Sequence, residues 1–230
     1  MPITRRDFIK TSSAGGACFG ISRKLGVASF QLNSTASMLT PQAKALVELF
    51  GLKYPIFQAP HGRQTCPDLA IAVSNAGAMG ALAGLGSPDQ ARLAVSKVRS
   101  ATMAPFFVNF LLATAPMSGN EPAALRSVLN AGAPVVQFSW GMPSKEAVAA
   151  IRTADAKMGI QVSSAESAHA ALDLGADYLV CQGTEAGGHV QATRGLYELR
   201  SSRPAALATG KVYAKHFWLV HLPQCLAPAL

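Results

Sequence analysis

The feature that most constrains the fold is a regular alternation of short apolar runs with helix-like segments. Six such runs recur about every 20–30 residues between Tyr54 and Gln182, and a segment with helical signals separates each from the next. The runs are continuous, as expected for parallel strands that are buried on both faces. They span residues 54–60, 80–84, 106–112, 135–140, 159–163 and 178–182. This alternation predicts a parallel α/β sheet, either doubly wound or closed as an eight-fold barrel.

Helix start and stop signals fall between these runs. Thr40-Pro41, Pro67-Asp68, Ser87-Pro88-Asp89 and Ser164 are typical of helix N-termini, and Gly132 and Gly175 of C-termini. We expect helices over residues 41–50, 67–76, 88–100, 121–130, 143–157 and 164–174.

Polar residues recur at the carboxyl ends of the predicted strands. They are Gln58, Asn109, Gln137, Ser139, Ser163 and Gln182. Each alone is more often a satisfied structural group than a ligand contact. In a barrel, however, these strand ends share one rim, so their recurrence predicts one common site.

The most informative segment follows the last predicted strand and runs from Gln182 through Gly183, Gly187 and Gly188 to His189. Glycines allow a backbone to turn sharply and to approach a bulky ligand. A histidine just beyond them can accept a proton near neutral pH. The alternative interpretation is a tight βα turn that happens to carry an inert histidine.

The regular alternation of strand-like and helix-like segments ends after His189. Residues 195–208 are compatible with one helix, whereas residues 211–230 show no helical or strand rhythm, and no acidic residue follows Glu198. A closed barrel needs about two more βα units. We therefore expect an incomplete barrel over residues 39–210 with about six βα units, followed by an aberrant tail over 211–230 from a truncated or frame-shifted C-terminus.

The charge distribution argues against a nucleic-acid partner. The net charge is +8, yet residues 31–199 carry as many acidic as basic residues, so the excess lies at the two ends. No apolar run reaches the roughly 18–20 residues needed to span a bilayer, so no membrane span is expected. The four cysteines form neither a CxxC pair nor a Cys/His cluster, which predicts no metal site.

The N-terminus carries paired arginines, Arg5 and Arg6, ahead of a weakly apolar stretch that ends near Ile21. This pattern resembles a twin-arginine export signal, which predicts a periplasmic protein. The alternative is a disordered basic tail on a cytoplasmic protein. In both cases residues 1–38 stay outside the folded domain.

Five motifs in order resemble the flavin-dependent nitronate monooxygenases, formerly called 2-nitropropane dioxygenases. They are Tyr54-Pro55-Ile56-Phe57-Gln58-Ala59-Pro60, Ser74-Asn75-Ala76-Gly77-Ala78-Met79-Gly80, Phe107-Val108-Asn109-Phe110, Val136-Gln137-Phe138-Ser139-Trp140-Gly141-Met142-Pro143 and Gln182-Gly183-Thr184-Glu185-Ala186-Gly187-Gly188-His189. The resemblance implies a TIM-type (β/α)8 barrel that binds FMN without a covalent bond at its carboxyl rim. It also implies oxidation of alkyl nitronates by molecular oxygen to carbonyl compounds and nitrite.

The resemblance assigns roles to individual residues. It implies FMN contacts at Asn109, Gln182 and Gly187, with Ala59, Ser163 and Gly188 beside them, and it makes His189 the active-site base. Glu185 has two candidate roles, orienting His189 or capping the turn, of which we favour the cap. His61 stands where the family usually has methionine, and the loops that hold the FMN phosphate in the family, after strands seven and eight, have no counterpart here.

Several alternatives stay open at this stage. A flavin-dependent enoyl reductase of fatty-acid synthesis shares the barrel and a similar Gly-Gly-His loop, and it would consume nicotinamide. A non-catalytic remnant, a flavin-free binding protein and a phosphate-binding barrel enzyme are the others. No G-x-G-x-x-G follows the first strand, which disfavours a dinucleotide-binding fold. The natural substrate and the oligomeric state are left open.

Overall fold

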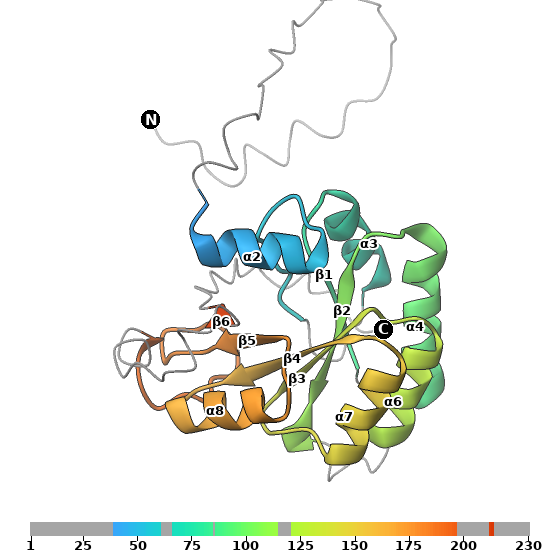
Figure 1. The fold of residues 1–230 in the computed structure, drawn as a ribbon. Helices are drawn as coiled ribbons and strands as arrows, with labels where there is room; N and C mark the ends of the chain where they lie inside the picture. Colours follow the sequence, from blue (N-terminus) through green and yellow to red (C-terminus); the bar gives the residue numbers. More distant parts are fainter. Residues whose placement is uncertain (1–38, 61–65, 85, 115–120, 197–211, 214–230) are drawn as a thin grey trace, which may run out of the picture. The chain divides into compact units, whose positions relative to one another are not determined.

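The computed structural model describes residues 39–60, 66–84, 86–114, 121–196 and 212–213, and the following concerns these residues. They contain one parallel sheet whose six strands are paired in sequence order (Figure 1). The strands are β1 Gly80–Ala83, β2 Phe106–Leu111, β3 Val135–Ser139, β4 Lys157–Val162, β5 Tyr178–Cys181 and β6 Val212–Tyr213. Parallel strands in sequence order, with a helix between each consecutive pair from β1 to β5, form part of a TIM-type βα barrel, as the sequence predicts.

The first predicted strand, 54–60, is wrong in its extent. Only Phe57 joins the sheet, through an isolated parallel bridge with Met79. The backbone N–H of Gln58 donates to Met79 at 2.8 Å, and the N–H of Met79 donates to Ile56 at 2.9 Å. Pro60 has no N–H to donate on one side, and on the other the N–H of Ile56 donates to Tyr54 at 2.8 Å, so the pairing does not spread in either direction.

The helices begin close to their predicted starts. They are α2 Pro41–Phe50, α3 Pro67–Asn75, α4 Pro88–Ala101, α6 Glu121–Asn130, α7 Lys145–Thr153 and α8 Ala165–Asp173, with a short 3-10 turn at Leu112–Thr114. The predicted caps are confirmed, because the side chains of Thr40, Ser87 and Ser164 each accept a backbone N–H of the first helical turn.

Helix α7 is shorter than predicted. It begins at Lys145, after the Ser144 cap, and ends at Thr153 rather than Lys157. Asp155 adopts a left-handed conformation with φ of 52°, which turns the chain out of the helix. Lys157 then opens β4, and its N–H donates to Pro134 at 3.0 Å. Pairing with the sheet therefore overrides the helical tendency of this segment.

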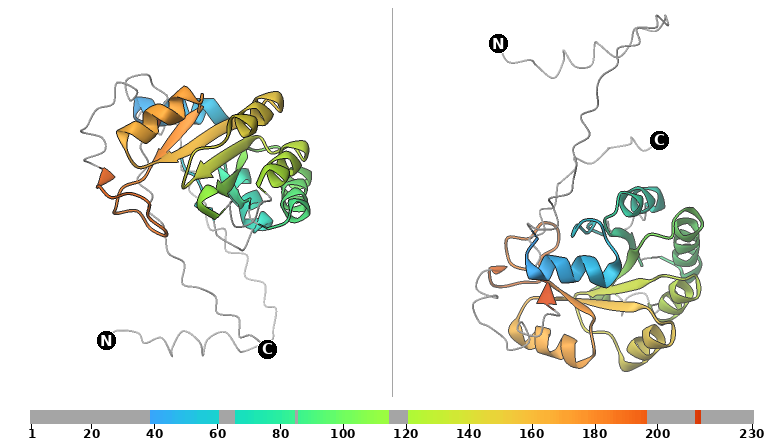
Figure 2. Two further views of the ribbon diagram at one scale, coloured as in Figure 1. Left: turned by 90° about the horizontal axis from the view of Figure 1, so that it is seen from below. Right: turned by 45° about the horizontal axis from the view of Figure 1, so that its top comes forward.

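Two apolar layers flank the sheet. The outer layer packs strand residues such as Val108 and Ile160 against α4, α6, α7 and α8. The inner layer joins Phe107 and Tyr178 to Leu46 of α2. Figure 2 shows α2 on the opposite side of the strands from α6 and α7. Helix α2 thus covers the interior of the partial barrel near the amino ends of the strands.

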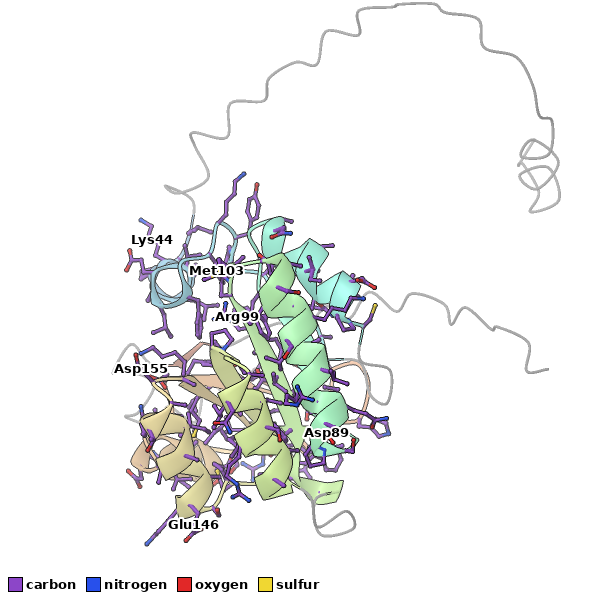
Figure 3. The ribbon with its side chains drawn as sticks, turned by 90° about the vertical axis from the view of Figure 1, so that its right-hand side faces the viewer. Lys44, Asp89, Arg99, Met103, Glu146 and Asp155 are labelled. Atoms are coloured by element: carbon purple, nitrogen blue, oxygen red, sulfur yellow. The ribbon has the colours of Figure 1, made fainter. Side chains whose placement is uncertain are left out.

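The carboxyl ends of the strands lie at the other end of this unit. Figure 3 shows Asp89 and Glu146, in the first turns of α4 and α7, at the end opposite Lys44 of α2. Each helix of the outer layer follows a strand, so its first turn marks the carboxyl end of that strand. No helix in the described part of the chain is both long enough and apolar enough to span a membrane.

Strand β6 pairs in parallel with β5, with Leu179 opposite Val212 and Val180 opposite Tyr213. It lies just beyond residue 210, where the sequence analysis places the end of the barrel. The N-terminal segment 1–38, His61, the predicted helix 195–208 from residue 197 onwards, and the tail other than Val212 and Tyr213 lie outside the described residues.

Candidate active site

The strand register stacks the polar residues of the interior in layers. Asn109 lies opposite Gln137, Gln137 opposite Gly159, and Gly159 opposite Tyr178. These four positions therefore share one level of the barrel interior, because paired residues of parallel strands face the same side. Two further polar side chains, those of Ser139 and Gln161, follow towards the carboxyl ends of β3 and β4.

Hydrogen bonds join this level into a buried network. The Tyr178 hydroxyl donates to Oε1 of Gln137 at 3.0 Å, and Nε2 of Gln137 donates to Oδ1 of Asn109 at 3.0 Å. The Ser139 hydroxyl donates to the same Oδ1 at 2.9 Å and lies 3.4 Å from Oε1 of Gln161. Asn109 is 8% exposed, and its Nδ2 meets no acceptor within the part of the chain that the structure describes. Among the described residues, this buried amide within β2 thus keeps its two N–H donors open.

The loop after β5 is held by a second set of contacts around Gln182. Its Nε2 donates to the backbone oxygen of His189 at 3.1 Å, and its Oε1 accepts the N–H of Gln191 at 2.9 Å. Nε2 of Gln191 lies 3.4 Å from the backbone oxygen of Gln161. The loop is therefore folded back onto the ends of β4 and β5, and the exposed His189 lies at this rim.

Glu185 and Gly183 fix the base of the same loop. The Glu185 carboxylate accepts the backbone N–H of Leu196, with oxygen distances of 2.9 and 3.1 Å. A side chain at Gly183 would collide with this carboxylate and with the backbone nitrogen of Leu196. These contacts tie Glu185 to Leu196, eleven residues further along the chain, and its two candidate roles stay predictions.

The glycines ahead of the histidine serve a different purpose. Gly188 has a φ of 78°, and a Cβ there would meet nothing within 4 Å. Its conformation, rather than crowding, is what favours glycine. Gly187 and Gly188 are both exposed, which leaves their backbone open to a ligand.

The remaining predicted residues are spread along the rim. Ala59 follows the Phe57 bridge and is half-buried, and Ser163 follows β4 with its N–H donating to the Ser167 hydroxyl at 3.2 Å. Gln58 proves structural, since its side-chain amide pairs with both backbone groups of Ala81 at 3.1 and 3.3 Å. These contacts extend the short pairing between the first strand and β1.

Sequence reasoning missed three members of the site. Tyr178, Gln161 and Gln191 complete the two sets of hydrogen bonds. Tyr178 stands in an apolar run that indicates only a buried strand. A usable signal is Gly159 within the neighbouring strand, since a glycine inside a strand often marks close approach by another group.

The chemistry of the rim is that of neutral donors and acceptors. This end of the sheet offers amides, a hydroxyl and exposed backbone, and the described residues contain no group of three His, Cys, Asp or Glu side chains suited to a metal ion. Neutral amides suit the polar edge of an uncharged heterocycle, because they donate and accept without adding charge.

Comparison with known proteins identifies the family. The family model for nitronate monooxygenase matches residues 43–208. A nitronate monooxygenase from Paraburkholderia phytofirmans is 29% identical over 190 residues, which cover 67% of this chain and 51% of the relative. One from Pseudomonas aeruginosa is 29% identical over 185 residues, covering 65% and 52%. The chain thus spans about half the length of these curated relatives.

Solved structures show the same fold. A FabK mutant from Thermotoga maritima superposes with a TM-score of 0.65 at 27% identity, covering 74% of this chain and 55% of that one. The nitroalkane oxidase from Streptomyces ansochromogenes gives a TM-score of 0.60 at 29% identity, covering 74% and 60%.

Proposed function

The chain belongs to the nitronate monooxygenase family, and from that premise we propose that it is an FMN-dependent oxidoreductase. Its substrates are alkyl nitronates and molecular oxygen, and its products are a carbonyl compound and nitrite. The observation that supports this proposal is the buried amide of Asn109, whose Nδ2 has no acceptor among the described residues.

The residues present fit a flavin. The polar edge of a flavin ring is rich in acceptors, and the Nδ2 group of Asn109 is a buried donor that lacks an acceptor among the described residues. Gly187 and Gly188 offer exposed backbone, and the small side chains of Ala59 and Ser163 leave room at the same rim. We propose that these five residues hold FMN. Gln182 holds the loop in place, because both polar atoms of its side-chain amide form hydrogen bonds with the loop backbone.

Bound FMN supplies the electron-transfer chemistry between the nitronate and oxygen. The protein supplies position and proton transfer. A nitronate is already an anion and needs no base. A neutral nitroalkane must first lose the proton on the carbon next to its nitro group, and in this proposal the imidazole of His189 accepts that proton. Gln182 holds the backbone of His189 and so limits the positions that the imidazole can reach.

Nitrite release tests the proposal. The full chain, supplied with FMN and propyl-2-nitronate in air, is expected to release nitrite and consume oxygen without added nicotinamide. A flavin-loaded chain that releases no nitrite, but consumes nicotinamide with an enoyl thioester, would instead establish the enoyl reductase alternative.

Export is a separate proposal that rests on the sequence of residues 1–38 alone. Replacing both Arg5 and Arg6 by lysine is expected to keep the protein in the cytoplasm if the twin-arginine route carries it. Equal periplasmic amounts of the two forms would refute this route.

A further inference from the structure

Tyr178 is the deepest member of the network that ends at Asn109. Its side chain is fully buried, and its ring crosses the position where a side chain at Gly159 would otherwise lie. The rings of Phe50 and Phe57 pack against it at centroid distances of 5.2 and 5.8 Å. The aromatic contacts and the absence of a side chain at Gly159 therefore fix where the phenol oxygen lies.

The Tyr178 hydroxyl also determines which atoms donate and which accept in the hydrogen bonds of this network. A hydroxyl has one proton, and a buried donor without an acceptor costs more than a buried acceptor without a donor. Gln137 is the one acceptor that the described residues offer to the Tyr178 hydroxyl, so the hydroxyl donates to Oε1 of Gln137. Burial raises the pKa of this phenol, so it keeps its proton throughout the ordinary pH range.

The direction of that first bond sets the next one. Since Oε1 of Gln137 faces Tyr178, its Nε2 faces Asn109 and donates to Oδ1. The Ser139 hydroxyl donates to the same oxygen, and at 2.9 Å this contact is shorter than its 3.4 Å approach to Gln161. With two donors on Oδ1, the amide of Asn109 is turned so that Nδ2 faces away from both.

We propose that Tyr178 and Gln137 are positioning residues that turn the Asn109 amide so that it presents N–H, not C=O, to the ligand. The ligand atom that this orientation selects is a neutral acceptor, such as a carbonyl oxygen or an unprotonated ring nitrogen. The inference rests on the proposed function, because it takes the ligand to be a flavin. It assigns the task of selecting what Asn109 can bind to two buried residues, Gln137, predicted only as one of the polar residues of the site, and Tyr178, for which the sequence predicts no role.

A double-mutant cycle on FMN affinity tests this inference. Tyr178→Phe removes one hydroxyl and keeps the ring. We expect the Kd for FMN to rise about 3–10-fold, the factor that corresponds to the free energy of one hydrogen bond. In an Asn109→Leu background, the same Tyr178→Phe change is expected to alter the Kd less than about twofold, because its effect passes through Asn109. Equal effects in both backgrounds would overturn the proposal.

Ser74→Ala is the matched control. It removes another buried hydroxyl, one that donates to the backbone oxygen of Pro105 at 2.9 Å, in the amino-end half of the structure. We expect it to lower thermal stability as Tyr178→Phe does and to leave the Kd for FMN unchanged. A Kd that rises equally in Ser74→Ala would assign the effect of Tyr178→Phe to lost stability and would contradict the inference.

A measurement without ligand separates this inference from the proposed function. If the unmodified chain takes up no FMN, the proposed function fails, and the amide orientation is read from the side-chain NH2 signals of Asn109 and Gln137 by NMR. A hydrogen-bonded Gln137 NH2 with a free Asn109 NH2 supports the proposal, and the reverse pattern overturns it. Gln137→Met, which keeps the side-chain length, is expected to shift the Asn109 signals in the folded protein, and unchanged signals would contradict the link.

Discussion

The side-chain amide of Gln182 binds the backbone oxygen of His189 at 3.1 Å, seven residues further along the chain. The other end of the same amide accepts the N–H of Gln191 at 2.9 Å. A residue at the end of a rigid strand thereby holds the backbone on both sides of Val190. The position of the proposed base depends on this pair of bonds.

Gln182→Leu tests that dependence. The change removes both bonds while keeping similar volume, so the free energy of unfolding is expected to fall by about 1 kcal/mol. Amide exchange at Gln191 is expected to accelerate, and kcat/KM for a neutral nitroalkane to fall about tenfold because the base is less well placed. The control is Gln90→Leu, which removes the capping-box bond to the Ser87 N–H on α4. If Gln191 exchange is as slow in Gln182→Leu as in the unmodified protein, Gln182 does not hold the loop.

His189→Ala is expected to separate two substrates. Removing a general base lowers turnover of a neutral nitroalkane by about 100-fold or more. Turnover of a preformed nitronate needs no proton removal and is expected to stay within about threefold of the unmodified protein. His169→Ala, on the exposed face of α8, is the control and is expected to change neither rate. Equal loss on both substrates would mean that His189 contributes to binding rather than to proton transfer.

Two glycines of the loop are expected to respond differently to alanine. At Gly183 the new methyl group collides with Glu185 and with the backbone of Leu196, so Gly183→Ala is expected to destabilise by several kcal/mol or to displace the loop. At Gly188 the space is open, and the cost is that of a left-handed alanine, about 1–2 kcal/mol. Thermal unfolding of both variants measures the difference, and a Gly188→Ala variant less stable than Gly183→Ala would contradict this assignment.

The buried phenol predicts a loss of stability at alkaline pH. Burial, with a smaller effect from the charge of Asp177, raises the pKa of Tyr178 above its ordinary value of 10.0. Above pH 10 the unfolded chain loses this proton while the folded chain keeps it, so deprotonation favours unfolding. The contribution of Tyr178 is therefore complete below pH 10 and falls by about 1.4 kcal/mol per pH unit above it. Chemical denaturation between about pH 10 and pH 11.5 is expected to show a steeper decline for the unmodified chain than for Tyr178→Phe. Parallel declines would show that Tyr178 titrates normally.

Most of the fold could be predicted because its signals are local. Continuous apolar runs marked β1 to β5, and Thr40, Ser87 and Ser164 marked helix starts. The errors arose where pairing with other strands decides the outcome. The first strand is cut short because Pro60 and Ile56 offer no N–H to β1, and the end of α7 is set by pairing of Lys157 with the sheet.

The site was predicted less completely, because contacts between residues far apart in the sequence also decide which side chains belong to it. Asn109, Gln182 and His189 stand in recognisable motifs; the structure places Gln182 and His189 beyond the end of β5 and Asn109 inside β2, two residues before its end. The partners Tyr178, Gln161 and Gln191 follow from strand register and from the return of the loop, which no local pattern specifies. The predicted break in the chain's organisation near residue 210 remains a prediction from sequence.

Flavin binding by the full chain tests the central claim most directly. The purified protein, titrated with FMN and followed by visible absorption and flavin fluorescence, is expected to bind one FMN, with absorption bands near roughly 370 and 450 nm. Asn109→Leu is expected to raise the Kd for FMN about tenfold, the factor that corresponds to the free energy of a buried hydrogen bond. A colourless protein that takes up no added FMN, although its folded core is intact by circular dichroism, would contradict the proposal that this rim is a flavin site.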